Sequence, residues 1–386
     1  MKKKKNILVA VAMSGGVDSS VAALLLKKQG YRAVGLTMQL VDCGQEKISG
    51  CCGIEAVNSA QKVCQKLSIP HYVVNFKQSF KKCVVDNFIK EYQGGRTPNP
   101  CVTCNEKIKF GLLLRRAREL GAEYLATGHY AQIRIKNNES RIMNYGLIKG
   151  VDKNKDQSYF LYRLNQKQLK HILFPLGNLT KSQVRQIAQR AGLPTANRPE
   201  SQEICFIPDN NYRYFLRQSG IKQKPGLIVD KKNKILGRHQ GLFQYTVGQR
   251  KGLGQLKIKN QKSKIKITNQ KSKIKESGTL PYYVIKVDAK RNKLVVGPEK
   301  DLYQKKCSVK SVNWISEKAP NLPIKIKAKI RYRHEAVPAV ITKNLKFIIY
   351  NLKFARPQRA ITPGQSAVFY LGRRVLGGGI IEAAID

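Results

Sequence analysis

The sequence predicts an α/β protein that begins with a doubly wound parallel sheet, continues into a small linking domain and ends in a C-terminal β-barrel. Three observations lead to this fold class. Strand-like and helix-like segments alternate up to about residue 200, short strand-like runs replace them from about residue 225, and 386 residues suffice for two or three domains. The expected domain limits are 1–208, 209–279 and 280–386.

In the first domain, apolar runs with strand character are separated by amphipathic segments with a helical period. Alternation at this spacing is typical of βαβ units, in which helices cover a parallel sheet. Thr180 is a suitable N-cap residue for the last helix of the series. We expect strands at 6–13, 31–38, 71–76 and 123–130, and helices at 17–29, 54–67, 77–91, 105–120 and 181–191.

The other two domains are predicted from short strands that Gly, Pro and Asn separate, a texture typical of small barrels. An insertion at about 257–276 repeats NQKSKIK and has few groups that could form a core, so we interpret it as solvated or disordered. A more apolar repeat at 344–354 fits a hairpin. The strand-like runs are 226–230, 282–289, 293–298, 324–332, 338–344, 365–371 and 375–381.

The net charge is +48, from 72 basic and 24 acidic residues. Residues 2–5 and eight lysines between 257 and 275 account for only part of this excess. A surplus of this size favours binding to a polyanion, and nucleic acid is the default partner. A lysine-biased genome is the alternative explanation.

The apolar runs are too short to span a bilayer, which argues against a membrane protein. The N-terminal segment starts with lysines and an apolar run, as a signal peptide does. However, the run Ile7–Met13 passes directly into a Gly-rich turn, which suits a first buried strand better. We therefore expect a cytoplasmic protein.

Nine cysteines in such a protein are unlike a disulfide framework, because the number is odd and the compartment is reducing. Three of them fall on helical faces or in a strand, where a core position is expected: Cys64, Cys83 and Cys307. Three others sit in a Gly-containing loop, where a zinc role is conceivable although no matching histidine cluster follows: Cys43, Cys51 and Cys52.

The stretch MSGGVDSS at 13–20 follows the first strand and opens the first helix. Its glycines allow a tight turn whose N–H groups converge, and the helix N-terminus adds positive potential, so we expect a phosphate site. Asp18 can hold Mg²⁺ against the phosphates. Met38 and Gly128 follow later strands and border the same edge of the sheet. The predicted nucleotide-binding residues are Ala12, Met13, Ser14, Gly15, Gly16, Val17, Asp18, Ser19, Met38 and Gly128.

Ser-Gly-Gly-Val-Asp-Ser resembles the pyrophosphate loop of the ATP pyrophosphatases, the PP-loop superfamily with a HUP-like fold. Together with GRTPNPCVTCNEKIKFG, TGHYA, KDQSYFLYRL, SQEICFIPD and TVGQRKGLG, it is similar to the tRNA-specific 2-thiouridylase family from residue 7 to about residue 381. The resemblance implies an enzyme that uses ATP to adenylate O2 of the wobble uridine in a tRNA anticodon loop. Sulfur from a donor protein, a cysteine desulfurase or a sulfur relay protein, then replaces this oxygen.

The resemblance also implies residue roles. Cys205 would carry a persulfide, Cys104 would be the nucleophile, and the two would end as a disulfide. Because Cys104 precedes a helix expected from residue 105, its thiol would profit from the helix dipole. Asn99, Pro100 and Cys101 align with the target-base motif, in which many members have Asp in place of Cys101. The aligned tRNA-contacting residues are His129, Lys155, Asp156, Gln157, Arg331, Tyr332 and Gln365.

Alternatives to the persulfide remain open at this point. Cys101, Cys104 and Cys205 provide three ligands for an iron–sulfur cluster with one open iron, and a structural zinc is a third reading. Two other functions also fit parts of the sequence. A related AMP-forming ligase or amidotransferase would share the phosphate loop, and a non-catalytic RNA-binding protein would share the basic surface.

Overall fold

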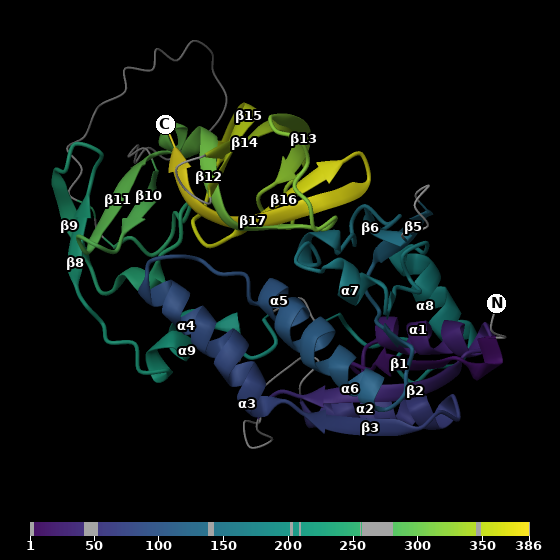
Figure 1. Ribbon diagram of the computed structural model, residues 1–386. Helices are drawn as coiled ribbons and strands as arrows, with labels where there is room; N and C mark the ends of the chain where they lie inside the picture. Colours follow the sequence, from purple (N-terminus) through teal and green to yellow (C-terminus); the bar gives the residue numbers. More distant parts are fainter. Residues whose placement is uncertain are drawn as a thin grey trace, which may run out of the picture.

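The computed structural model describes residues 4–41, 53–137, 143–200, 204–207, 210–254, 256, 281–344 and 349–385. Three sheets organise the chain, and Figure 1 shows the α/β part at one end, the C-terminal barrel above it and a small sheet beside both. In the described residues, no helix combines the length and the apolar character needed to cross a membrane. Cys43, Cys51, Cys52 and the lysine-rich repeat lie outside the described residues.

The first sheet is parallel, as predicted, and has the order β3-β2-β1-β4-β7. The central strand β1 is buried on both sides: Val9 and Val11 pack into one apolar cluster and Ala10 into the other. This two-sided burial is why its sequence is continuously apolar. The strands are β1 Leu8–Ala12, β2 Arg32–Gln39, β3 His71–Asn75, β4 Tyr124–Ala126 and β7 Ile172–Leu173.

Helices cover both faces of this sheet, which confirms the doubly wound architecture. On the side of Val9 and Val11 lie α1 Val17–Lys28, α2 Ile54–Lys66 and α8 Lys181–Arg190, with α8 beside α1 (Figure 1). On the side of Ala10 lie two longer helical runs that each contain a π-helical stretch. The first run is α3 Lys77–Phe80, Lys81–Val85 and α4 Asp86–Gln93, and the second is α5 Pro100–Thr103, Cys104–Leu113 and α6 Leu114–Glu119.

The second sheet has the order β10-β11-β8-β9 and joins strands from both sides of the lysine-rich repeat. Its strands are β8 Gly226–Val229, β9 Ile235–His239, β10 Tyr282–Asp288 and β11 Lys293–Pro298. The expected limit at residue 280 separates β10 and β11 from the strands with which they pair. The repeat interrupts this sheet in the sequence, and a long interruption resembles a domain boundary when only the sequence is read.

The third sheet contains a closed six-stranded barrel, because its first strand also pairs with its last, β12 with β17. The barrel core includes Cys307, Phe354 and Phe369. Closure leaves no exposed edge within the barrel. In spatial order its strands are β12 Tyr303–Trp314, β15 Ile349–Arg359, β14 Val337–Asn344, β13 Ile324–Lys329, β16 Ser366–Leu371 and β17 Arg374–Ile385.

The repeat at 344–354, expected to form a hairpin, instead adds one strand arm to a longer pair: Asn344 ends β14 and pairs with Ile349, and residues 349–354 all lie within β15. A hairpin comes from the α/β part of the chain and attaches to the barrel through Ile148, which pairs with Arg374. It consists of β5 Ala131–Asn137 and β6 Met143–Lys149. The short remaining helices are α7 Gln166–Leu169, α9 Tyr212–Gln218, Lys4–Asn6, Ser158–Phe160, Leu242–Gln244 and Glu299–Leu302.

Candidate active site at the end of the parallel sheet

The loop between β1 and α1 folds back on itself through its serines. Ser14 N donates to Ser19 Oγ at 3.2 Å, and Ser19 Oγ donates to the carbonyl of Gly16 at 3.0 Å. Gly16 is the N-cap of α1 in an extended conformation, and no side chain caps the helix there. The positive end of α1 therefore faces the loop without a capping group, an arrangement that suits an anion.

Two glycines at this loop are required by close approach. Gly15 has φ +70°, and a Cβ there would collide with the carbonyl oxygen of Ala56. A Cβ on Gly128, just after β4, would lie 2.8 Å from the Cβ of Asp18. Arg198 Nη1 donates to the Gly15 carbonyl at 3.0 Å and holds the turn from outside. The loop therefore depends on these positions remaining glycine.

A pocket of about 650 Å³, counted with its open mouth, lies at the carboxyl ends of β1, β2 and β4. Ligands of doubly wound sheets bind at this edge. Nine of the residues expected to touch a nucleotide, a base or tRNA line it: Ala12, Met13, Ser14, Asp18, Ser19, Met38, Gly128, His129 and Gln157. Leu36, Lys109 and Thr127 also line it although no motif indicated them, whereas Gly15, Gly16 and Val17 are not among its lining residues.

The carboxylate of Asp18 is held at the rim of the pocket. Lys181 Nζ, from the first residue of α8, lies 2.7 Å and 2.8 Å from its two oxygens, and the Tyr130 hydroxyl donates to it at 2.8 Å. Burial, followed by the charge of Asp18, raises the pKa of Tyr130, so this hydroxyl stays a donor. The sequence did not single out Lys181, because its partner lies 163 residues away.

Lys181 also contacts Glu200 at 3.3 Å, and Glu200 pairs with Lys155 at 2.6 Å. Burial alone would raise the pKa of Glu200, but the hydrogen bond from Lys155 and the charge of Lys181 hold it below its usual value. An ionic chain thus runs from Asp18 to Lys155 by way of Lys181 and Glu200. It connects the phosphate loop to the residues that precede the segment carrying Cys205.

The helix that carries the paired cysteines begins earlier than expected. Asn99 is its N-cap, with Oδ1 accepting from Val102 N at 3.4 Å, and Pro100 is its first residue. Asn-Pro is a strong start signal, since the proline needs no N–H partner there. Cys104 consequently lies more than one turn inside the helix. The expectation that the dipole at a helix N-terminus activates this thiol is wrong.

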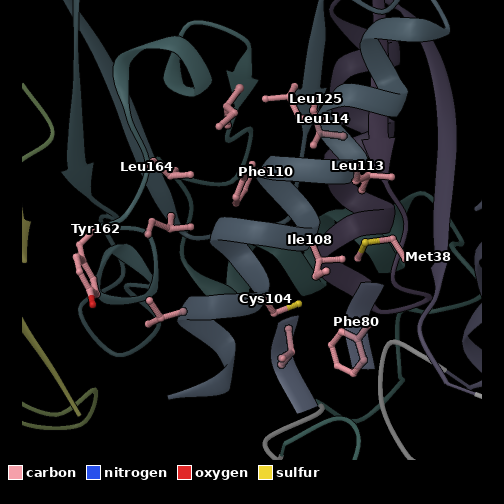
Figure 2. Close-up of a cluster of buried hydrophobic side chains, with 14 of the residues drawn as sticks. Met38, Phe80, Cys104, Ile108, Phe110, Leu113, Leu114, Leu125, Tyr162 and Leu164 are labelled. Atoms are coloured by element: carbon pink, nitrogen blue, oxygen red, sulfur yellow. The ribbon is translucent and has the colours of Figure 1, made fainter. Parts of the chain in front are cut away.

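Cys104 is buried and points into the apolar core near Ile108 and Phe80, as Figure 2 shows. Lys109, five residues further along the same helical run, lines the pocket itself. Cys101, at the start of the helix, is exposed. One helical run therefore places Cys101 at the surface, Cys104 in the core and Lys109 at the pocket.

Cys205 packs, partly buried, against the same core as Cys104. Its neighbour Phe206 anchors the segment, with its ring edge-on to Phe80 at 5.7 Å and to Phe88 at 5.4 Å. No disulfide is seen among the six described cysteines, so the expected Cys104–Cys205 disulfide is not shown by this structure.

No group of three or more potential metal ligands forms among the described residues. Cys101, Cys104 and Cys205 therefore do not gather into a cluster site, and the iron–sulfur and zinc alternatives gain no support from this arrangement. The other described cysteines behave as core residues. Burial raises the pKa of Cys64 to about 11 and that of Cys307 to about 12, and Cys83 is half-buried.

Three family models match consecutive parts of the chain. Residues 7–209 match the tRNA methyl transferase HUP domain, residues 213–298 the tRNA methyl transferase PRC-barrel domain, and residues 304–381 the aminomethyltransferase beta-barrel domain. The middle match ends at the last residue of β11.

Curated relatives match along the whole chain. The tRNA-specific 2-thiouridylase MnmA of Geobacter metallireducens is 45% identical over 100% of this chain and 99% of its own length. The protein of the same name from Acetivibrio thermocellus is 46% identical over 99% and 100%. The chain belongs to the tRNA-specific 2-thiouridylase family.

Most of the residues expected to contact tRNA make hydrogen bonds or ring contacts within the protein. Asp156 is buried and accepts hydrogen bonds from Gly150 N and Ser158 N, each at 3.1 Å. Gln157 accepts from Tyr130 N at 3.0 Å while it lines the pocket. This segment therefore fixes the wall of the pocket through side-chain oxygens that accept from backbone N–H groups.

His129 packs beside the rings of Phe110 and Phe174, with centroids 5.8 Å and 5.9 Å away, and these two rings also contact each other at 6.0 Å. Its Nδ1 is 2.7 Å from Thr127 Oγ1. Burial, followed by the charge of Lys109, holds its pKa well below the usual value. A neutral imidazole in this place can accept or donate a hydrogen bond without adding charge to the pocket.

Arg331, Tyr332 and Gln365 lie away from the pocket lining, where the barrel meets the rest of the molecule. Arg331 Nη2 donates to the carbonyl oxygens of Val247 at 3.2 Å and Ala360 at 2.9 Å. The Tyr332 ring packs on Phe160 at 4.5 Å. The sequence could not reveal the contacts with Val247 and Phe160, because they join residues of different domains.

Proposed function

We propose that this protein is an ATP-dependent tRNA-uridine 2-sulfurtransferase that converts the wobble uridine of certain tRNAs to 2-thiouridine. Support comes from one helical run that brings Lys109 to the phosphate-loop pocket and Cys104 to the core on which Cys205 packs. A nucleotide site and two thiols on shared supports suit a reaction in which an activated oxygen is exchanged for sulfur. A ligase or amidotransferase with the same loop would need neither thiol.

The first step is adenylation of the base. A carbonyl oxygen is a poor leaving group, so O2 attacks the α-phosphorus of ATP and pyrophosphate departs. Ser14, Ser19 and the N-terminus of α1 would bind the phosphates. Asp18 would hold Mg²⁺, which suits a metal that takes one or two carboxylates plus substrate phosphates. The carboxylate already faces this pocket, and Lys181 beside it offers a second cation for the phosphates.

The second step transfers sulfur. The terminal sulfur of a Cys205 persulfide attacks C2, and AMP leaves with the former O2. The Cys104 thiolate then attacks Sγ of Cys205 and breaks the S–S bond, which leaves sulfur on C2 and forms a Cys104–Cys205 disulfide. The transferred sulfur gains the two electrons that the two thiolates lose. A thiol reductant must regenerate the pair, and a sulfur-donor protein must reload Cys205.

The RNA side of the proposal rests on charge and chemistry. A net charge of +48 favours a polyanionic substrate. The base has to leave the anticodon stack to reach the pocket, as it does in other enzymes that modify bases. Asn99, Pro100 and Cys101 would receive it, with His129 and the Lys155–Gln157 segment near the RNA. We place the reaction in the cytoplasm, where tRNA and sulfur donors are found.

Substituting the thiols tests the sulfur step. Cys205→Ser removes the sulfur carrier and Cys104→Ser removes the group that resolves it, while both leave the phosphate loop intact. Each variant should therefore still consume ATP with tRNA present and make no 2-thiouridine. Mass spectrometry of digested tRNA measures the product, and pyrophosphate release measures the first step. Full product formation by either variant would refute the assigned role.

Cys101→Asp separates the persulfide from the cluster mechanism. It restores the residue that many family members carry, so under the persulfide mechanism the variant should remain active and contain no iron. Under the cluster mechanism it removes a ligand, so iron content and activity should fall together. Iron and protein are quantified on the same sample as the 2-thiouridine. An inactive variant that has lost its iron would refute the persulfide mechanism.

Asp18→Asn tests the ATP site. The side chain is only partly buried, so the fold should persist, but the variant loses the charge that would hold the metal. Pyrophosphate release with tRNA should fall at least about 100-fold, the scale of a lost electrostatic group in an active site. Release at the parental rate would show that the nucleotide binds elsewhere.

A further inference from the structure

Residues 95–99 lead directly into the helix that carries Cys101 and Cys104, and we call them the 95–99 loop. Arg96 anchors the loop at one end. Its Nε donates to Glu91 at 2.8 Å, its Nη1 to Glu382 at 3.0 Å, and its Nη2 to the carbonyl of Ile381 at 3.1 Å. The Arg96 side chain is only 17% exposed. A single guanidinium thus joins α4 of the α/β domain to β17 of the barrel.

The other end of the loop is held by the turn between β15 and β16 of the barrel. Gln365 Nε2 donates to the carbonyl oxygens of Thr97 at 2.9 Å and Pro98 at 3.2 Å. Thr97 N donates to the carbonyl of Pro363 at 2.9 Å. The amide of Gln365, expected to contact tRNA, is therefore occupied by the residues immediately before Asn99.

The 95–99 loop approaches the barrel and β10 so closely that a glycine is needed at each of the two contacts. Gly364 has φ +91°, and a Cβ there would lie 2.8 Å from Thr97 N and O. A Cβ on Gly95, with φ +68°, would lie 2.8 Å from Cγ1 of Val287 in β10. Thr97 Oγ1 is also 3.1 Å from Thr246 Oγ1 in the central domain. Residues 95–99 thus contact the α/β domain, the central domain and the barrel. They lie directly before the helix that starts at Pro100 and carries Cys101 and Cys104, which we call the catalytic helix.

We propose that Arg96 and Gln365 are positioning residues through which the barrel sets the start of the catalytic helix, and with it the place of Cys104 and of the target-base motif. The proposal rests on the proposed function for its kinetic consequence only. Asn99 caps this helix directly after the loop, so a shift of the loop moves the cap and the whole first turn. A displacement of about 1 Å at a reacting group can cost on the order of 100-fold in rate.

Arg96→Gln in the full chain is the first test. Alkylation of each cysteine by iodoacetamide is followed by peptide mass spectrometry without ATP or tRNA, so this measurement is independent of the proposed function. Cys104 is buried and should react at least about threefold faster in the variant, because local opening limits the reaction of a buried thiol. Cys307, buried in the barrel core, should keep its parental rate and reports on global unfolding.

Steady-state kinetics is the second measurement. For Arg96→Gln, kcat for 2-thiouridine should fall at least about tenfold while KM for tRNA stays within about twofold, since geometry rather than RNA contact is lost. Arg96→Lys should recover part of kcat, because it keeps the charge opposite Glu91 and Glu382 but not the fork. Arg116→Gln breaks an exposed Arg–Glu pair on α6 and is the matched control that should change neither measurement.

Gln365→Leu serves if Arg96→Gln does not fold, since it removes only the two donors to the loop. It should accelerate Cys104 alkylation and lower kcat in the same way. A raised KM for tRNA with unchanged kcat and unchanged alkylation would show a direct RNA contact and overturn the proposal. So would equal acceleration at Cys104 and Cys307. If the parent makes no 2-thiouridine, the proposed function fails while the alkylation result still decides the positioning role.

Discussion

At the scale of single residues, His129 shows how burial selects a protonation state. Its ring is buried, packs against Phe110 and Phe174 and lies near Lys109, so protonation would place a second cation in a desolvated site. The neutral ring is compatible with an uncharged base entering the pocket. Protonating this ring costs free energy in the folded state only, because the histidine has its ordinary pKa in the unfolded chain.

The stability of the protein should therefore fall as the pH drops through about 6.5, the ordinary pKa of histidine. Below that pH the unfolded chain binds a proton at His129 and the folded chain does not. This difference contributes a slope of up to about 1.4 kcal/mol per pH unit to the free energy of unfolding. His129→Gln should show a shallower loss of thermal midpoint between pH 7.5 and 5.5. Parallel curves for parent and variant would contradict this account.

Single residues were predictable where a local motif defines them. The serines and glycines of the phosphate loop could be predicted because a turn between a strand and a helix leaves few choices. Lys181, Glu200 and Arg96 could not, since each acts through a partner distant in sequence, 286 residues away for Arg96 and Glu382. The role of Cys104 stays a prediction, and its position was mispredicted, because the Asn99–Pro100 start signal places it more than one turn inside the helix.

At the scale of elements, α8 delivers a charge to the pocket from its first residue. Thr180 and Gln183 form a capping box: Thr180 Oγ1 accepts from Gln183 N at 3.3 Å, and Gln183 Oε1 accepts from Thr180 N at 2.8 Å. The cap fixes where α8 starts and thereby where Lys181 leaves the backbone. This helix was predicted almost to the residue, since its cap and its apolar period agree.

Thr180→Ala should lower stability by about 1 kcal/mol, the usual cost of a lost N-cap, and should weaken ATP binding because Lys181 loses its fixed start. Thr180→Ser keeps the hydroxyl and should retain both properties. Thermal denaturation and ATP titration measure the two effects. A loss of stability with unchanged ATP affinity would show that the position of Lys181 does not depend on the cap.

At the scale of the whole molecule, three sheets contain strands that are far apart in the sequence. The fold class was predictable because alternating elements and then short strands persist over long stretches. The pairing of β8 and β9 with β10 and β11 was not, because the lysine-rich repeat separates them in sequence. Neither was the docking of the β5–β6 hairpin on the barrel, which joins parts of the chain that sequence patterns treat as separate.

Deleting residues 257–275 should leave the thermal midpoint nearly unchanged, since a low-complexity lysine segment contributes little core. The deletion removes eight cations, so tRNA affinity should decrease modestly and depend less steeply on salt. Binding titrations at several salt concentrations and a thermal melt measure both effects. A failure of the deleted chain to express would show that the segment is structural.

The close contacts of the 95–99 loop also constrain how members of the family can exchange parts by recombination. A crossover between the α/β domain and the barrel would take Thr97 from one parent and Gly364 from the other, although a Cβ at 364 leaves only 2.8 Å to the backbone of Thr97. Arg96 and Glu382 would likewise come from different parents. Because both sides of this junction have to match, the two domains should be inherited together, and chimeras should fail unless both sides are exchanged at once.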